Sequence, residues 1–224
     1  MANQKQVAVL GLGVFGNALC QTLEDYGVEV LAIDIDPEKI DHIMDHVTKA
    51  VIADVTDRSQ LVEAGIQDFD TVVVSLSSHF EESVLCTLIL KELNIPRIIA
   101  KAPTNRKKAI LERVGADEVI NSDRAMAIRL AKSMLRKSIV ESVDLDEDYS
   151  IVEINVLNDW IDKSLIMLNL RRIMGMNVIA IKSAPDYKLN MDFTGDYTFK
   201  KGDHLIVVAK TERIEQWDYL LKDY

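Results

Sequence analysis

The stretch "QVAVLGLGVFG" (6–16) joins a short apolar run to glycines in the spacing G-x-G-x-x-G. These glycines are Gly11, Gly13 and Gly16. Between a strand and a helix, the first permits a tight turn, the second lets the backbone approach a pyrophosphate, and the third allows close helix packing. A second apolar run ends on Asp34, 23 residues after Gly11, where a carboxylate accepts hydrogen bonds from ribose hydroxyls. Because that carboxylate repels a 2′-phosphate, the pattern favours NAD or another adenosine nucleotide over NADP.

From this turn to about residue 137, short apolar runs alternate with stretches that have the apolar periodicity of helices. Strands so short and apolar, separated by helices, indicate parallel pairing with both faces covered. We therefore expect an α/β fold with a Rossmann-like doubly wound parallel sheet. The expected strands are 6–11, 28–34, 49–54, 71–76, 97–102 and 117–121, and the expected helices are 15–26, 37–46, 58–65, 80–94, 105–115 and 122–143.

The pattern changes at the acidic stretch "VDLDEDYS" (143–150), which lacks apolar periodicity and indicates a boundary. We predict two domains, 1–143 and 144–224, the second a small α+β unit. Its expected strands are 150–157, 177–184 and one that follows a turn at 201–203 within the stretch 198–210. Its expected helices are 163–175 and 211–222.

Composition narrows the classes of function. The chain has 224 residues, of which 48% are hydrophobic, so it can bury a substantial core. A net charge of −10 argues against general nucleic-acid binding and against docking on anionic lipid. We identify no signal peptide and no apolar run near the ~18 residues of a membrane span. Cys20 and Cys86, two isolated cysteines, favour buried thiols in a reducing cytosol over a disulfide.

Groups for catalysis are sparse. His42 and His46 have i, i+4 spacing, which suits a metal site, although a solvated helix face is the favoured interpretation. His79 follows the fourth expected strand, at the side of the expected ligand crevice, where it could touch a nucleotide or lie exposed. His204 lies near the last strand and is interpreted as structural. Lys101, at the end of the fifth strand, could meet a phosphate or solvate the sheet edge.

Several stretches together resemble one family. They are "VAVLGLGVFG", "EVLAIDIDPEKID", "ADVTD", "TLILKELNIPRIIAKA" and "LERVGADEVI", followed by "YSIVEINV", "KSLIMLNLRRIMGMNVIAIK" and "GDHLIVVAK". The chain resembles the RCK (KTN) domain regulatory subunits of bacterial potassium uptake systems, of the KtrA/TrkA type, with an RCK-C (TrkA-C) lobe. This resemblance implies a non-enzymatic cytoplasmic ring, typically an octamer, beneath a potassium-translocating membrane subunit of the KtrB/TrkH type.

The resemblance also implies a nucleotide site for ATP, ADP or NAD(H). It places Gly11, Gly13 and Gly16 at the phosphates, with Lys101 nearby, and Asp34 at the ribose. The loop flanking the adenine is Ala53, Asp54, Val55 and Thr56, with Ser75 and Leu76 on the fourth-strand side. The same site includes Val14, Phe15, Ile35 and Lys39.

Two departures from the family pattern concern phosphates and metal. Relatives often have an arginine at the position of Val14, where it reaches a γ-phosphate across a dimer, so discrimination between ATP and ADP by that route is in doubt. Some relatives coordinate a divalent cation through a glutamate at the position of Asp123, and the shorter aspartate makes that a weaker metal site.

The C-terminal lobe of many relatives binds cyclic di-AMP at a two-fold dimer interface, which shuts the transporter. The matching positions are Leu165, Ile166, Arg171 and Asn177, and a proline often found later in that site is replaced near Phe193. Two symmetry-related arginines could clamp the two phosphates by bidentate hydrogen bonds. The alternative is that the apolar pair belongs to the core and Arg171 caps a helix C-terminus.

Apolar residues recur along the long helix expected at 122–143, which suits an interface with a partner subunit or core packing within the chain. They are Met126, Ile128, Leu130, Ala131, Met134 and Leu135. Two other functions stay open: a small NAD-dependent oxidoreductase using His79 or Lys101, and a reporter of the NADH/NAD ratio. A substrate pocket over the nicotinamide side would favour the enzyme, whereas a separate C-terminal lobe favours the regulator.

Overall fold

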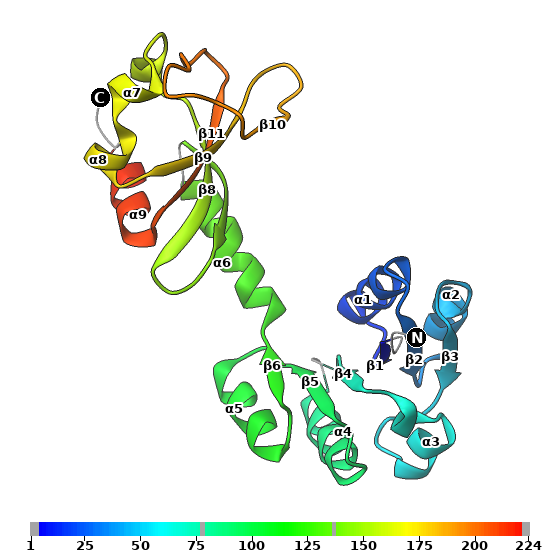
Figure 1. Cartoon of the computed structure of the whole chain (residues 1–224). Coiled ribbons are helices and arrows are strands. Elements are labelled where there is room, and N and C mark those ends of the chain that lie inside the picture. Colours follow the sequence, from blue (N-terminus) through cyan, green and yellow to red (C-terminus); the bar gives the residue numbers. More distant parts are fainter. Residues whose placement is uncertain (1–4, 77–78, 136–137, 221–224) are drawn as a thin grey trace. The chain divides into compact units, whose positions relative to one another are not determined.

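The computed structural model describes residues 5–76, 79–135 and 138–220 and divides into two compact units, 1–126 and 127–224 (Figure 1). Each unit has its own sheet. The helix α6 (Ser122–Leu135) begins in the first unit and ends in the second. The domain boundary expected between residues 143 and 144 stays a prediction.

The first unit is a parallel sheet with the order β3-β2-β1-β4-β5-β6. Its strands are β1 (Gln6–Leu10), β2 (Glu29–Asp34), β3 (Lys49–Ile52), β4 (Thr71–Val74), β5 (Arg97–Lys101) and β6 (Glu118–Ile120). The order reverses direction between β1 and β4, so a crevice opens at their carboxyl ends. The predicted doubly wound sheet is confirmed.

Helices cover both faces of this sheet (Figure 1). The helices are α1 (Val14–Asp25), α2 (Pro37–Ile43), α3 (Arg58–Glu63), α4 (Phe80–Glu92) and α5 (Asn105–Val114), with 3-10 turns at Met44–His46 and Ile66–Asp68. Alternate residues of β1 face opposite sides: Val9 packs with Cys20 of α1, and Leu10 packs with Leu90 of α4. Strand residues buried on both faces explain why these runs are apolar throughout.

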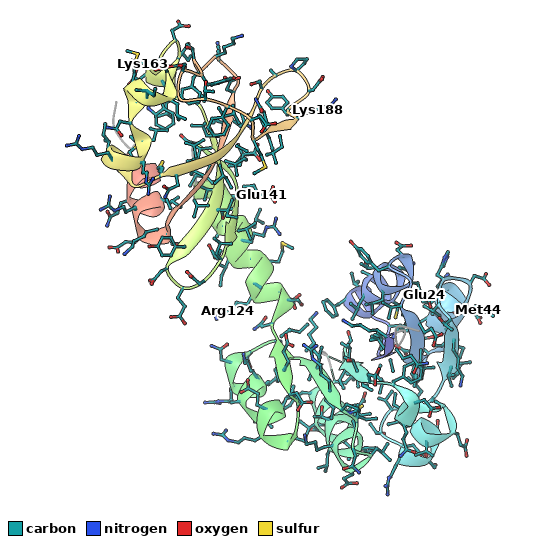
Figure 2. All side chains as sticks on the ribbon, viewed as in Figure 1. Glu24, Met44, Arg124, Glu141, Lys163 and Lys188 are labelled. Atoms are coloured by element: carbon teal, nitrogen blue, oxygen red, sulfur yellow. The ribbon has the colours of Figure 1, made fainter. Side chains whose placement is uncertain are left out.

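Polar side chains fix the helix ends in the first unit. Asp36 accepts a hydrogen bond from the N–H of Glu38 and caps α2, which has Pro37 at its first position. Glu24 of α1, labelled in Figure 2, accepts hydrogen bonds from the N–H of Val30 (3.3 Å) and the hydroxyl of Thr48 (2.5 Å). These contacts tie α1 to β2 and to the segment that enters β3.

The second unit is an antiparallel sheet with the order β10-β9-β11-β8-β7. Its strands are β7 (Ile139–Asp144), β8 (Tyr149–Asn155), β9 (Asn177–Lys182), β10 (Leu189–Asn190) and β11 (His204–Lys210). Its helices are α7 (Leu165–Leu168), α8 (Leu170–Met174) and α9 (Thr211–Leu220), with a 3-10 turn at Asn158–Trp160. Trp160, Phe199 and Leu205 are buried in its core. The expected small α+β lobe is confirmed.

Two expected helices are wrong in part. The helix predicted at 122–143 gives way to strand β7 at Ile139–Asp144, which pairs with β8. The helix predicted at 163–175 is broken at Asn169, which has a left-handed backbone (φ 43°) between α7 and α8. Asparagine adopts this conformation more readily than most residues, so the break is encoded locally.

The two cysteines are buried, free thiols. Burial raises the pKa of Cys20 to about 12, and it raises the pKa of Cys86 still further. Both thiols therefore stay protonated and unreactive at neutral pH, as the sequence indicates.

A charged cluster joins three strands of the second sheet. The carboxylate of Glu153 (β8) contacts the ammonium of Lys182 (β9) at 2.5 Å and Nδ1 of His204 (β11) at 2.6 Å, and its side chain is 11% exposed. Burial, the largest influence, acts to raise the pKa of Glu153, but the hydrogen bonds and electrostatic interactions with Lys182 and His204 outweigh it and hold the pKa below its ordinary 4.5. His204 is thus part of the structure of the lobe, as interpreted from the sequence.

Replacing Glu153 with glutamine is expected to lower the free energy of unfolding of the second unit by about 1–2 kcal/mol at pH 7. Because the folded pKa is depressed, this stabilisation is present above pH 4.5 and disappears as the pH falls through the folded value. Both tryptophans, Trp160 and Trp217, lie in this unit, so urea denaturation followed by tryptophan fluorescence measures it.

The control variant is Glu141→Gln, which removes an exposed ion pair with Arg129 (3.3 Å) and should change stability by less than about 0.5 kcal/mol. An equal loss in both variants, or a Glu153→Gln loss that does not diminish as the pH falls below 4.5, would contradict this account of the cluster.

Candidate functional site

The turn after β1 needs two of its three glycines for the fold itself. Gly11 has φ +94°, and a Cβ there would lie 2.7 Å from the side chain of Leu76. A Cβ on Gly16 would lie 2.0 Å from the backbone oxygen of Gly11. These two glycines are therefore explained by a tight turn and by close packing of α1 on the sheet.

Gly13 is different. Its backbone (φ −66°, ψ −176°) suits any residue, and no described atom lies within 4 Å of the place where its Cβ would be. It is the N-cap of α1, whose first N–H groups lack intrahelical partners. Nothing in the described fold requires a glycine here, whereas a ligand lying against the backbone would. The helix N-terminus beside it also attracts anions.

Asp34 ends β2 next to this turn, and its side chain is 7% exposed. Its carboxylate accepts hydrogen bonds from the N–H of Leu12 (2.7 Å) and of Asp36 (3.0 Å) and from the ammonium of Lys39 (3.1 and 3.3 Å). Burial acts most strongly and raises the pKa, but these donors together hold the pKa of Asp34 below its ordinary value. The carboxylate is therefore ionised at neutral pH, as an acceptor for ribose hydroxyls must be.

A pocket of about 130 Å³ opens beside Asp34 at the carboxyl edge of the sheet. Its lining combines the glycine turn, the end of β2, the segment after β3 and the end of β4. The lining residues are Gly11, Asp34, Ile35, Ala53, Asp54, Val55, Thr56, Leu76 and Glu82. The structure therefore brings together eight of the residues expected at the nucleotide site.

Glu82 was not expected from the sequence. It lies in the first turn of α4, and that turn follows β4 at the same edge of the sheet as the glycine turn. The rule that ligands bind at the carboxyl ends of parallel strands could have drawn attention to this turn.

Lys101 ends β5 at the same edge, and only 10% of its side chain is exposed. Its ammonium lies 3.5 Å from a carboxylate oxygen of Asp123, which is 76% exposed, and 5.3 Å from the ring centroid of Phe15. An ammonium has three donors, so one long ion pair and one aromatic face leave it able to bind an anion. Lys101 and Phe15 thus meet beside the N-terminus of α1.

The other expected nucleotide residues lie around the pocket without lining it. Val14, in the first turn of α1, is 94% exposed. Ser75 is buried, and its N–H donates to the carbonyl of Leu10. Lys39 is half-exposed and touches the pocket through Asp34. The residues outside the lining are Gly13, Val14, Phe15, Gly16, Lys39, Ser75 and Lys101.

Replacing Gly16 with alanine is expected to destabilise the first unit by about 2–3 kcal/mol, because the new methyl would overlap backbone that cannot turn aside. Amide hydrogen exchange along β1 and β4 measures this, with the amides of β8 and β11 as the internal control. Unchanged protection in β1 would contradict the packing described for this turn.

A second pocket, of about 450 Å³, lies in the second unit where α7, α8 and the start of β9 meet. It is lined by Leu165, Ile166, Asn169, Leu170, Arg171, Met176, Asn177, Val178 and Gly195. All four residues that the family resemblance assigned to a C-lobe ligand are in this set. The structure brings them together because the turn at Asn169 places Ile166 and Arg171 beside the same opening.

Gly195 was not singled out from the sequence. The N–H of Ile166 donates to the carbonyl of Gly195 (3.0 Å), and a Cβ on Gly195 would lie 2.6 Å from the side chain of Ile166. The glycine therefore allows this segment to lie against α7. Phe193, where relatives often have proline, is partly buried and packs against the core of the lobe.

Within the described ranges of the chain, no three His, Cys, Asp or Glu side chains are grouped so that they could hold a metal ion. His42 lies in α2 and His46 in the following 3-10 turn. His79 is the N-cap residue of α4.

The glycine turn, the parallel sheet and the antiparallel lobe define a two-lobed Rossmann-like protein. Residues 7–122 match the family model of the TrkA-N domain, and residues 149–218 match that of the TrkA-C domain. Ktr system potassium uptake protein A of Bacillus subtilis (strain 168) is 36% identical over 214 residues, which cover 96% of both chains. Ktr system potassium uptake protein A of Vibrio alginolyticus is 32% identical over 210 residues, which cover 94% of both chains. The chain therefore belongs to the family of Ktr and Trk potassium uptake proteins with TrkA-N and TrkA-C domains.

Solved structures share the fold. The crystal structure of the GsuK RCK domain has a TM-score of 0.63 at 15% identity and covers 99% of this chain and 48% of that one. The GsuK channel bound to NAD has a TM-score of 0.65 at 14% identity and covers 98% of this chain and 40% of that one. This chain thus spans less than half the length of those proteins and has the RCK fold.

Proposed function

We propose that this chain is a cytoplasmic, non-enzymatic regulatory subunit of a potassium uptake system, and that an adenosine nucleotide bound to its first unit controls transport. The observation that carries the nucleotide part is Gly13, a glycine for which the described fold has no use and which lies open at a helix N-terminus. The potassium part follows from the Ktr relatives, which match along nearly the whole chain.

The charges of the site suit the parts of an adenosine nucleotide. Its phosphates would lie on the N–H groups at the start of α1, with Gly13 leaving room and Lys101 supplying a buried positive charge. Its ribose would donate to the ionised Asp34. Its adenine would enter the pocket formed by Ala53–Thr56 and Leu76. ATP, ADP and NAD(H) share these parts.

The Ktr relatives are named as proteins of a potassium uptake system, which supports a partnership with a membrane protein. Among the described residues, the structure contains no helix with the length and apolar character needed to cross a bilayer. From the relatives, we propose that the chain works on the inner face of the membrane, bound to a potassium-translocating subunit of the KtrB/TrkH type.

Self-assembly is supported by α6. Apolar side chains along this helix are exposed in the single chain, at Met126, Ile128, Leu130 and Met134. A second copy that covers them would bury this surface, and a ring of such dimers, typically an octamer, would place many nucleotide sites under one channel. A nucleotide that binds one dimer geometry more tightly would then shift the population of open channels.

The second pocket supports an additional ligand, cyclic di-AMP. Arg171 supplies a guanidinium that can hold phosphate, Leu165 and Ile166 supply an apolar floor for a purine, and Asn177 supplies a polar edge. Because Ile166 is largely exposed, a symmetric ligand between two copies would cover apolar surface from both. This ligand would inhibit transport. A divalent cation at Asp123 would join the nucleotide site only by competing with Lys101 for that carboxylate.

Calorimetric titration with ATP, ADP, NADH and cyclic di-AMP tests the binding assignments. The proposal predicts binding of at least one adenosine nucleotide and, at a separate site, of cyclic di-AMP. Incubation with NADH and simple carbonyl substrates tests the alternative of an oxidoreductase. Turnover of NADH that disappears in His79→Ala would overturn the regulatory assignment.

A further inference from the structure

Lys39 lies where the ribose of a bound nucleotide would meet Asp34. It is in the first turns of α2, five residues after Asp34, and its side chain is 42% exposed. Its ammonium contacts both carboxylate oxygens of Asp34, at 3.1 and 3.3 Å, and lies 4.0 Å from a carboxylate oxygen of Asp36. The carboxylate that would recognise the ribose is therefore already paired with the Lys39 ammonium.

The contacts of Asp34 show how this ion pair limits the hydrogen bonds that the carboxylate can still accept. A carboxylate accepts about four hydrogen bonds, and Asp34 has two from backbone N–H groups and two contacts from Lys39. A ribose hydroxyl that donates to Asp34 must share with the ammonium or displace it. In either arrangement the positive charge lies next to the ribose 2′ position.

We propose that Lys39 determines specificity at the ribose 2′ position by weakening the discrimination that Asp34 alone would impose against a 2′-phosphate. This inference rests on the proposed nucleotide site. A lone carboxylate at the end of β2 repels a 2′-phosphate, as the sequence pattern indicates. Lys39 neutralises that carboxylate and can donate directly to phosphate oxygens, because it has three N–H donors. The pocket therefore accepts 2′-phosphorylated adenosine nucleotides with a smaller loss of affinity than its Asp34 predicts.

A merely structural role for Lys39 makes a different prediction. If the ion pair serves only to hold the start of α2 against β2, its loss would weaken all adenosine nucleotides equally. The ratio of two dissociation constants, rather than either constant alone, separates these possibilities.

The experiment measures that ratio for NADPH and NADH, which differ only by the 2′-phosphate, by calorimetric titration of the full chain. The same ratio is taken for adenosine 2′,5′-bisphosphate and AMP, which lack the nicotinamide. The variants are Lys39→Met, which keeps the apolar stem, and Lys39→Arg, which keeps the charge. Lys91→Met is the matched control, because Lys91, near the end of α4, carries the same charge and pairs with Asp117, and neither residue lines the nucleotide pocket.

In Lys39→Met, the affinity ratio against the 2′-phosphate should rise by about tenfold, as expected for one half-exposed charge. It should stay within about twofold of wild type in Lys39→Arg and Lys91→Met. An unchanged or smaller ratio in Lys39→Met, with binding retained, would overturn this inference alone. Failure of all four nucleotides, and of ATP and ADP, to bind the wild-type chain would overturn the proposed nucleotide site as well.

Discussion

Replacing Gly13 with alanine should weaken binding of ADP or NADH by at least about 100-fold while leaving the fold intact. The added methyl meets no described atom of the protein, and the backbone angles suit alanine. The free energy of unfolding should therefore change by less than about 1 kcal/mol, since the weaker N-cap is offset by a less flexible unfolded chain. Binding should be lost because the methyl occupies the space through which a pyrophosphate approaches the helix N-terminus.

This prediction is measured by calorimetric titration, with amide hydrogen exchange as the check on folding. The second pocket is an internal control, because its ligand binding should be unaffected. Nucleotide binding within about threefold of wild type in Gly13→Ala would show that the glycine has no role toward a ligand. Gly16→Ala behaves differently, because there the methyl overlaps the protein itself.

Replacing Arg171 with alanine should weaken binding of cyclic di-AMP by at least about 100-fold. A hydrogen bond to a charged group contributes about 1.5–3 kcal/mol, and a ligand held on a two-fold axis loses this contribution twice. Arg171 lines the second pocket and is exposed, so its removal leaves the core of the lobe in place.

Arg172→Ala is the matched control for this prediction. Arg172 is the next residue of α8 and is also exposed, but it is absent from the lining of the pocket. The Arg172→Ala variant should bind cyclic di-AMP with the affinity of the wild-type chain. Equal affinities of the Arg171 and Arg172 variants would remove the second pocket from the account, and Arg171 would then serve only the end of its helix.

Much of the first unit could be predicted because its signals are local. Apolar strands such as β1 have residues buried on both faces, here 8–10, and the glycines follow the strand at fixed spacing. The helix predicted for the segment after α6 was wrong because "IVESV" (139–143) fits a continuing helix and an edge strand equally well. Only the pairing of this segment with β8 decides between them. Short apolar runs have this ambiguity in general.

The residues of the candidate site could be predicted where they lie in or near one turn of the chain. They could not be predicted where segments distant in the sequence meet. Gly11 and Asp34 could be assigned from their spacing, but Glu82 joins them through the order of the strands. The ion pair between Lys39 and Asp34 depends on the direction in which α2 runs after its N-cap. The spacing of the two residues in the sequence does not give that direction. Four residues of the second pocket were expected from family resemblance, and the turn at Asn169 supplies the physical reason that they meet.

The most direct test of the whole account is potassium uptake in Bacillus subtilis lacking its Ktr proteins A and C, the relatives that are 36% and 34% identical to this chain. Uptake at limiting potassium would be measured with the wild-type chain and with Gly13→Ala, expressed at equal levels. We predict that the wild-type chain restores uptake and that Gly13→Ala does not. Restoration by both to the same extent, or by neither, would contradict a nucleotide-controlled subunit of potassium transport.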